Sequence, residues 1–296
     1  MADIVLLDGG MGQELIHRAG DKPTPLWATQ VMIDHPGMVQ AVHGDYFAAG
    51  ATVATTNTYC VHHDRLLGAG LDRRFLDLHQ AALGEAKAAR LAAGRGRIAG
   101  SIGPLVASYR PDVHPGHAEA VAKYAEVAQV LAGHVDLILC ETVASLAHAR
   151  AVMEGALSVG LPVWLSVTVD DRDGRLLRSG EPVAKVCEVG AGAEALLANC
   201  SAPEAMAAAL AALKPSGKPF GAYANGFTQI TADFLKDKPT VDALRARRDL
   251  TPAVYADYAL DWVAQGATIV GGCCEVGPAH IAELARRLRA AGHEIV

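Results

Sequence analysis

The stretch Val135-Asp136-Leu137-Ile138-Leu139-Cys140-Glu141-Thr142 decides the fold class of this chain. Its apolar side chains follow one another almost without interruption, whereas a strand with one face in water would alternate apolar and polar residues. The sequence Ala-Thr-Ile-Val-Gly-Gly at residues 267–272 is of the same kind. Both stretches are typical of strands in a parallel sheet that is covered on its two faces.

Working outward from this stretch, we find eight short apolar or β-branched runs bounded by turn residues. They occupy residues 4–10, 52–59, 97–104, 135–142, 163–169, 193–201, 220–226 and 267–274. The segments between them, such as residues 72–93 and 117–132, have the composition or the spacing of helices. Eight strand–helix units predict a (β/α)8 TIM barrel of the α/β class, with residues 1–296 forming a single domain. A doubly wound open sheet is the alternative, but it would normally contain fewer strands.

One segment interrupts this regular alternation. Residues 227–250 follow the seventh run and contain the charged groups 236–238 and 245–248. We expect this segment to be an insertion that forms part of a lid or of an oligomer contact.

Composition and charge exclude several classes of protein. The 296 residues are 51% hydrophobic and carry a formal net charge of -6, without a basic tract that could neutralise a nucleic-acid backbone. No apolar run approaches the roughly 18 residues of a membrane span, and the first residues lack the pattern of a signal peptide. We therefore expect a cytoplasmic monomer or small homo-oligomer that acts on small molecules. The six cysteines are too few for a disulfide scaffold, which favours free thiols.

Polar or reactive residues end most of the predicted strands. Because the carboxyl ends of barrel strands share one face, where active sites are built, we expect these residues to lie close together. Any one of them could instead be structural, and it is their recurrence that points to a site. They are Asp8, Asn57, Ser101, Glu141, Cys200, Asn225 and the pair Cys273 and Cys274.

The cysteines among them suggest a metal centre. Neighbouring α-carbons are about 3.8 Å apart, below the usual disulfide span of about 4.4–6.8 Å, so a bridge between Cys273 and Cys274 would be strained. Both could bind one metal if the chain turns there, which Gly271 and Gly272 make easy. Cys200 could supply a third thiolate, and three thiolates favour zinc with one open position. The spacing alone is equally compatible with cysteines that pack as small apolar residues.

Seven motifs in order resemble those of the homocysteine S-methyltransferase family, over nearly the whole chain. They are Asp8-Gly9-Gly10-Met11-Gly12, Thr55-Thr56-Asn57-Thr58-Tyr59, Gly100-Ser101-Ile102-Gly103-Pro104, Glu141-Thr142, Asn199-Cys200, Tyr223-Ala224-Asn225 and Gly271-Gly272-Cys273-Cys274. The resemblance implies a zinc-dependent (β/α)8 barrel that transfers a methyl group to the thiol of homocysteine and so makes methionine.

The resemblance also implies roles for individual residues. One Zn²⁺ per chain would be held by Cys200, Cys273 and Cys274. The amino-acid part of homocysteine would lie against the turn Asp8, Gly9, Gly10, with Glu141 on its ammonium group, a charge-assisted contact. The further substrate contacts expected from the matched motifs are Thr55, Asn57, Ser101 and Asn225.

A cationic methyl donor calls for aromatic faces, and aromatic residues make up only 5% of the chain. The candidates are Trp27, Tyr59 and Tyr109, although Trp27 could equally pack a loop. Betaine-using relatives have aromatic residues where Cys60 and Thr142 stand here, and a longer C-terminal extension. We therefore expect a sulfonium donor, S-methylmethionine first and S-adenosylmethionine second.

The chain departs from the family pattern at two positions. Glu275 follows the cysteine pair where the family commonly has Gly or Arg, and His148 stands where a second Glu is often found. Three alternative functions stay open for the chain: a betaine–homocysteine methyltransferase, a zinc-assisted hydrolase or lyase, and a thiol-binding protein on the same barrel.

Overall fold

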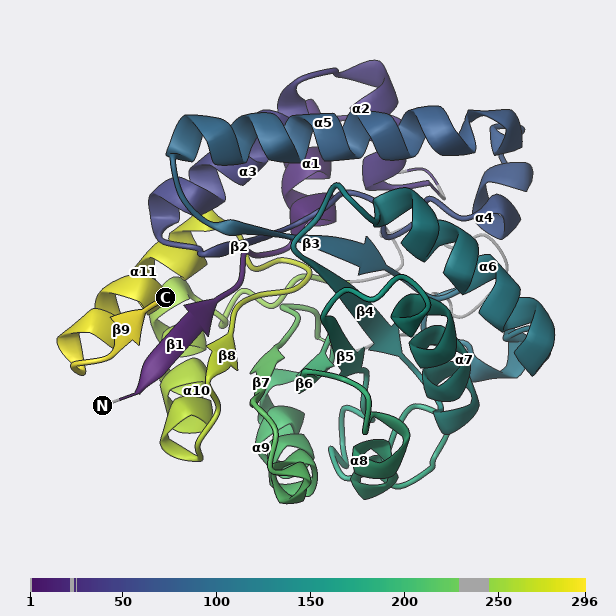
Figure 1. Cartoon of the computed structure of the whole chain (residues 1–296). Helices are drawn as coiled ribbons and strands as arrows, with labels where there is room; N and C mark the ends of the chain where they lie inside the picture. Colours follow the sequence, from purple (N-terminus) through teal and green to yellow (C-terminus); the bar gives the residue numbers. More distant parts are fainter. Residues whose placement is uncertain (1, 22–23, 25, 229–244) are drawn as a thin grey trace.

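The computed structural model describes residues 2–21, 24, 26–228 and 245–296 of the chain. These residues form one α/β domain in which a parallel sheet curls on itself and helices cover its outer face (Figure 1). Most of the predicted insertion, residues 229–244, lies outside the described residues. The part of the chain that the structure describes contains no helix with both the length and the apolar character needed to cross a lipid bilayer.

Eight strands form the barrel, in the order of the sequence. They are β1 (Asp3–Leu6), β2 (Val53–Thr55), β3 (Arg97–Ile102), β4 (Leu137–Val143), β5 (Val163–Val167), β6 (Ala195–Asn199), β7 (Phe220–Tyr223) and β8 (Ile269–Val270). Every neighbouring pair from β2 to β8 is parallel, and β8 pairs with β1. The ring closes between β1 and β2 through a parallel bridge of Leu7 with Val53, whose carbonyl accepts the Asp8 amide at 3.1 Å. The prediction of a TIM barrel is thus confirmed, and the open sheet is excluded.

Helices occupy the connections between the strands, as the sequence predicts. They are α1 (Met11–Ala19), α2 (Ala28–Asp34), α3 (Met38–Ala49), α4 (His63–Leu67), α5 (Phe75–Ala93), α6 (His117–Leu131), α7 (Leu146–Leu157), α8 (Val186–Val189), α9 (Pro203–Leu213), α10 (Pro252–Ala264) and α11 (Pro278–Ala290). A short ninth strand that the sequence did not suggest, β9 (Glu294–Ile295), pairs with β1 outside the ring.

Local chemistry sets several of these helix boundaries. Proline occupies the first position of α9, α10 and α11, where its missing amide proton leaves no hydrogen bond unmade. The hydroxyl of Ser145 accepts the amide of His148 before α7, and that of Thr251 accepts the amide of Val254 before α10. These caps place the start of each helix just beyond a strand-end loop.

Two cores result from the alternation of side chains along the strands. Leu6, Ile98, Ile138 and Leu196 face outward into a large apolar cluster beneath the helices. Side chains of the opposite parity face the barrel interior and form a second cluster: Leu7, Val53, Ala99, Leu137, Leu139, Trp164, Ala195, Leu197, Tyr223 and Ile269. Because successive residues of a strand point to opposite faces, the parity of a residue decides whether it can reach the interior.

Candidate active site and metal centre

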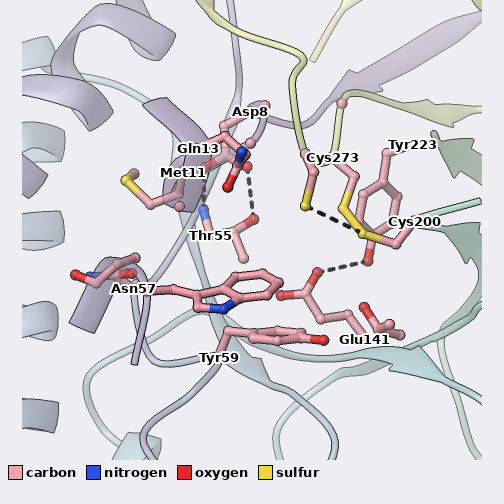
Figure 2. Close-up of a pocket in the computed structure, with 18 of the residues that line it drawn as sticks. Asp8, Met11, Gln13, Thr55, Asn57, Tyr59, Glu141, Cys200, Tyr223 and Cys273 are labelled. Atoms are coloured by element: carbon pink, nitrogen blue, oxygen red, sulfur yellow. Dashed lines mark hydrogen bonds between the residues drawn. A yellow bond between two sulfur atoms is a disulfide. The ribbon is translucent and has the colours of Figure 1, made fainter. Parts of the chain in front are cut away.

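The carboxyl ends of the strands enclose a cavity of about 810 Å³, including the space open to solvent (Figure 2). Residues two positions apart on a strand point to the same face. Thr55 therefore points into the barrel like Val53, and Glu141 like Leu139, but each lies one step nearer the carboxyl end of its strand. The lining residues are Leu7, Asp8, Gly9, Gly10, Met11, Gly12, Gln13, Trp27, Ala28, Thr29, Thr55, Thr56, Asn57, Tyr59, Cys60, Tyr109, Glu141, Thr142, Cys200, Tyr223, Gly272, Cys273 and Cys274. A lining of apolar and aromatic side chains with a few convergent polar groups is typical of a small-molecule site.

Three cysteine sulfurs converge on one wall of this cavity. The sulfurs of Cys200, Cys273 and Cys274 all lie within 4.8 Å of one another, the only such cluster of potential ligands among the described residues. The Cys200 and Cys274 sulfurs are 3.9 Å apart. Two thiolates on a tetrahedral ion at about 2.3 Å would be roughly 3.8 Å apart, so this pair fits a shared metal. The three cysteines are thus a candidate metal site, each offering one sulfur ligand.

The structure differs from the sequence prediction of six free thiols. Cys200 and Cys273 are joined as a disulfide, with their α-carbons 5.6 Å apart, whereas Cys60, Cys140, Cys187 and Cys274 are free. The curl of the barrel brings the ends of β6 and β8 together, which places the two sulfurs within bonding distance. Metal binding by all three cysteines therefore requires that this bond be reduced.

Backbone close packing places the cysteine segment against the first loop. A Cβ atom on Gly9 would lie 2.0 Å from the Val276 carbonyl oxygen, and one on Gly10 would lie 2.5 Å from the Cys273 carbonyl oxygen. Only glycine allows this approach, which the hydrogen bond from the Gly10 amide to Val276 closes at 2.9 Å. Both glycines line the cavity, and the structure also gives them this packing role.

Two buried carboxylates face the cavity from different strands. Asp8 accepts the Thr55 amide at 2.7 Å and the Thr55 hydroxyl at 2.8 Å. Glu141 accepts the Ser101 hydroxyl at 2.5 Å and the Tyr223 hydroxyl at 3.3 Å. Burial raises the pKa of each carboxyl to about 7, against the lowering effect of these hydrogen bonds. A ligand cation within reach of both would stabilise their ionised forms.

Aromatic rings line the same cavity. Trp27 precedes α2, Tyr59 lies in the turn after β2, and Tyr109 lies in the loop after β3. The Tyr59 hydroxyl is 2.7 Å from the Ser108 hydroxyl, and the Arg65 guanidinium lies 5.6 Å from the Tyr59 ring centroid. Figure 2 shows Tyr59 across the cavity from Asp8. The three candidate donor residues are thus brought together.

Two expected substrate residues lie beside the cavity instead of lining it. Ser101 is buried beneath Glu141, to which it donates its hydroxyl. Asn225 is also buried, and its side-chain oxygen accepts the Phe227 amide at 3.2 Å. Asn57 does line the cavity, but its amide group donates to the Ala28 carbonyl at 3.1 Å, which ties α2 to the rim.

Several lining residues were missed at the level of sequence. Tyr223 ends β7 with interior parity, a signal that could have identified it as a partner of Glu141. Gln13 is buried, and it donates to Glu275 at 2.6 Å. The lining residues without a strand-end signal include Met11, Thr29 and Cys60.

Strained backbone is concentrated at this rim. Six described residues other than glycine have positive φ, and four of them line the cavity: Trp27 (48°), Tyr109 (62°), Thr142 (59°) and Cys200 (48°). Asn199 supports one of them, because its side chain accepts the Thr142 amide at 2.9 Å and donates to the Thr142 hydroxyl at 3.0 Å. Such conformations persist where the surroundings enforce them, which is common at functional sites.

The two departures from the family pattern lie in different places. Glu275 has φ of 64°, and its carboxylate lies at the rim, 3.8 Å from the His17 ring as well as beside Gln13. His148 is buried behind the barrel, where its ring stacks on His114 and Tyr124. Glu275 is therefore close enough to influence the site, whereas His148 belongs to the packing of α6 on α7.

A closed (β/α)8 barrel with a three-cysteine metal site at the carboxyl ends of its strands defines a metal-binding barrel enzyme. Residues 5–288 match the sequence model of a family described as homocysteine S-methyltransferase. The chain belongs to this family, and its class of enzyme is homocysteine S-methyltransferase.

Individual relatives agree over nearly their full length. The homocysteine S-methyltransferase of Escherichia coli (strain K12) is 32% identical over 96% of this chain and 95% of its own. Homocysteine S-methyltransferase 4 of Zea mays is 28% identical over 98% of this chain and 90% of its own. The crystal structure of MmuM, the E. coli homocysteine methyltransferase, in its metallated form has a TM-score of 0.79 and 31% identity, over 96% of each chain. Its oxidized form has the same TM-score and coverage.

Proposed function

We propose that this chain transfers a methyl group from a sulfonium donor, S-methylmethionine first and S-adenosylmethionine second, to the thiol of L-homocysteine. The observation that carries the proposal is the arrangement of one cavity: three convergent cysteine sulfurs, two buried carboxylates and four aromatic rings line it together. The products would be methionine and the demethylated donor.

Zinc is the ion that we propose for the cysteine site, because three thiolates suit it and leave a fourth position open. When bound, zinc would supply a positive charge that lowers the pKa of a thiol and keeps the thiolate nucleophilic at neutral pH. The protein side of the site depends on such a cation, since burial raises the pKa of Cys274 to about 12, with the negative charges of Glu275 and Glu141 adding to the effect.

The carboxylates would hold homocysteine by its ammonium group. Glu141 and Asp8 both face the cavity, and an ammonium ion would compensate the burial that raises their pKa values. The amide of Gly10 donates to Val276, so we assign the first loop a shaping role beside these two side chains. Ser101 and Tyr223 would orient Glu141 through their hydroxyl groups.

The charge of the cavity favours a sulfonium donor over betaine. Among the described residues that line it, two are acidic and none is Lys or Arg. S-methylmethionine and S-adenosylmethionine each carry one net positive charge at neutral pH, whereas betaine is neutral overall. Cys60 and Thr142 also line the cavity, at the positions that would bear aromatic rings in betaine-using relatives. Exclusion of water would further favour the step, because an anionic nucleophile and a cationic donor lose their charges together.

The test is an assay of methionine formation by reduced, zinc-loaded protein with L-homocysteine. S-methylmethionine, S-adenosylmethionine and betaine are supplied in parallel, and a sample without homocysteine reports hydrolysis of the donor. We expect methionine from the sulfonium donors and none from betaine.

Two results would contradict the proposal. A preference for betaine would refute the charge argument while leaving the methyltransferase class intact. Absence of methionine with every donor, in a sample whose zinc content has been verified, would show that the substrates differ and would direct attention to Glu275.

A further inference from the structure

An ion pair in the loop after β5 contacts the site without lining the cavity. The Arg178 Nη1 and Nη2 groups donate to the two carboxylate oxygens of Asp171, each at 2.8 Å. Only 12% of the Arg178 side chain and 17% of the Asp171 side chain are exposed. A two-pronged pair of this kind is geometrically specific and less screened than an exposed pair.

Arg178 contacts the aromatic half of the site, which is formed by Trp27, Tyr59 and Tyr109. Its guanidinium carbon lies 5.5 Å from the centroid of the Tyr109 ring, within the range of a cation–π contact. Tyr109 packs with Cys200 and Phe227 in one apolar cluster, against which Cys273 and Cys274 also pack. Arg178 thus holds the Tyr109 ring, which lies next to the cysteine cluster.

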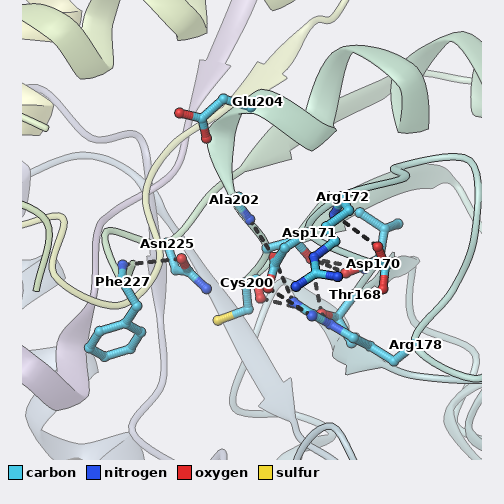
Figure 3. A network of polar contacts seen from close by, with 12 residues as sticks. Thr168, Asp170, Asp171, Arg172, Arg178, Cys200, Ala202, Glu204, Asn225 and Phe227 are labelled. Atoms are coloured by element: carbon cyan, nitrogen blue, oxygen red, sulfur yellow. Dashed lines mark hydrogen bonds and ion pairs between the residues drawn. The ribbon is translucent and has the colours of Figure 1, made fainter. Parts of the chain in front are cut away.

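The same pair reaches the segment that begins with the metal ligand Cys200. The Asp171 carboxylate accepts the Ala202 amide at 2.8 Å. Arg178 Nε donates to the Thr168 hydroxyl at 3.3 Å, and this hydroxyl donates to the Cys200 carbonyl at 3.3 Å. Figure 3 shows Asp171 and Arg178 beside Cys200 and Ala202. Two connections therefore fix a segment whose first residue has φ of 48°.

We propose that Asp171 and Arg178 are a positioning pair for both halves of the site. Arg178 supports the Tyr109 ring, and Asp171 fixes the Cys200–Ala202 segment. Asp171 also cancels the positive charge that Arg178 would otherwise present to a cationic methyl donor. This last role rests on the proposed function, whereas the fixing of the Cys200 segment does not.

The charge relation explains why an arginine can lie beside a ring that binds a cation. A guanidinium over the Tyr109 ring weakens the attraction of that ring for a further cation. Its positive charge also repels a second cation nearby. A carboxylate in a bidentate contact removes most of this repulsion without moving the arginine. The chain can thus use Arg178 as a support for Tyr109 while the cavity remains favourable for a positive ligand.

Asp171→Asn tests the charge role in the metal-loaded enzyme. It preserves the shape and an oxygen that can accept the Ala202 amide, but leaves Arg178 uncompensated. We expect the KM for S-methylmethionine to rise about tenfold, which corresponds to about 1.4 kcal/mol, because the uncompensated guanidinium would repel the cationic donor. The KM for homocysteine should stay within about twofold, and the donor effect should shrink as salt is added.

Two further variants separate charge from packing. The double variant Asp171→Asn with Arg178→Met removes both charges and should bring the donor KM back toward the wild-type value. Asp173→Asn is the matched control: Asp173 pairs with Arg175 in the same loop, but Arg175 is 74% exposed. This control should leave both KM values unchanged.

Asp171→Ala tests the positioning role without any turnover. It removes the acceptor of the Ala202 amide, and we expect the metal affinity of the reduced protein to fall about tenfold, as for other groups that orient metal ligands. Competition with a chromophoric chelator for zinc measures this affinity. Asp171→Asn and Asp173→Asn should retain the wild-type affinity, and thermal melts of all variants confirm that they fold.

Each result decides one part of the proposal. An unchanged donor KM in Asp171→Asn, or an equal rise of both KM values without salt dependence, would overturn the charge role. Wild-type metal affinity in Asp171→Ala would overturn the positioning role. If the zinc-loaded wild type makes no methionine from any sulfonium, the proposed function fails, and the chelator experiment still decides whether Asp171 positions the Cys200 segment.

Discussion

The cysteine half of the site and its aromatic half are built in different ways. Cys200 directly follows β6, and Cys273 comes three residues after the end of β8. Their places are set by the parallel hydrogen-bond ladder of the barrel, because β6, β7 and β8 are neighbours. The converging sulfurs need only the closure of the ring and the turn at each strand end.

The aromatic half depends on loops that side chains hold in place. Trp27 precedes α2, which the Asn57 side chain binds through the Ala28 carbonyl. Tyr59 is fixed by Ser108, and Tyr109 lies against Arg178. The comparison teaches that the same cavity combines a wall made by backbone pairing with a wall made by individual side-chain contacts. We expect substitution of a cysteine ligand to abolish activity. Substitution in the aromatic wall should instead lower activity by graded amounts.

The largest effect should come from breaking the cysteine half. Cys274→Ala removes one of three metal ligands, so zinc binding and methionine formation should both fall to background. Metal analysis of the purified protein and the methionine assay measure these two quantities. Cys60→Ala is the control, since Cys60 lines the same cavity outside the cluster and should leave the zinc content unchanged. Full activity of Cys274→Ala would refute the assignment of the metal site.

A smaller loss should follow when the charge that faces homocysteine is removed. Glu141→Gln retains the size of the side chain but not its negative charge, and we expect kcat/KM for homocysteine to fall about a hundredfold. The KM for the sulfonium donor should change much less. Ser101→Ala removes only a hydroxyl that orients Glu141 and should cost less than Glu141→Gln. An unaltered homocysteine KM in Glu141→Gln would exclude this carboxylate as the ammonium partner.

Breaking the aromatic half should give a graded effect on one substrate. Tyr59→Leu replaces a ring with an aliphatic side chain, and we expect the donor KM to rise about tenfold through the loss of a cation–π contact. Tyr59→Phe keeps the ring and loses only the hydroxyl contact with Ser108, so it should stay close to wild type. Steady-state kinetics with each substrate varied in turn will measure both. Equal effects of the two substitutions would mean that the hydroxyl, not the ring face, is what matters.

The smallest effect on catalysis is expected from a residue outside both halves of the site, whose substitution changes stability instead. His148 is buried behind the barrel, and burial holds its pKa well below the usual value, with the nearby His114 and His62 lowering it further. The unfolded chain therefore takes up a proton as the pH falls below about 6.5, which the folded chain does not. This histidine thus costs stability below that pH, by about 1.4 kcal/mol per pH unit until the folded form protonates.

His148→Phe should remove that dependence. The free energy of unfolding of the variant, relative to wild type, should increase as the pH falls from 6.5 to 5, as measured by urea denaturation. Asp8 and Glu141, whose raised pKa values give the opposite slope up to about 7, are present in both proteins and cancel in the difference. Val152→Ala is the control, because Val152 is a buried apolar residue of the same helix and its truncation should change stability by an amount independent of pH. A constant difference for His148→Phe would mean that His148 does not titrate in this way.

The barrel and the cysteine half could be predicted because their signals are local. The apolar runs mark the strands, and the residues at their ends must share one face once the ring is closed. Glu141 and Cys200 were identified in this way, and the cavity brings them together. Ser101 and Asn225 have the same signal but lie beside the cavity, since ending a strand does not say how far inward a side chain reaches.

The sequence by itself determined the fold class and the number of barrel strands, because these follow from local hydrophobic patterns. Only the tertiary structure decided that Cys200 lies within bonding distance of Cys273, that Leu7 closes the ring on Val53, and that Asp171 and Arg178 link the β5 loop to the site. These contacts join residues far apart in the chain. Their existence depends on the curl of the whole sheet, which no local pattern records.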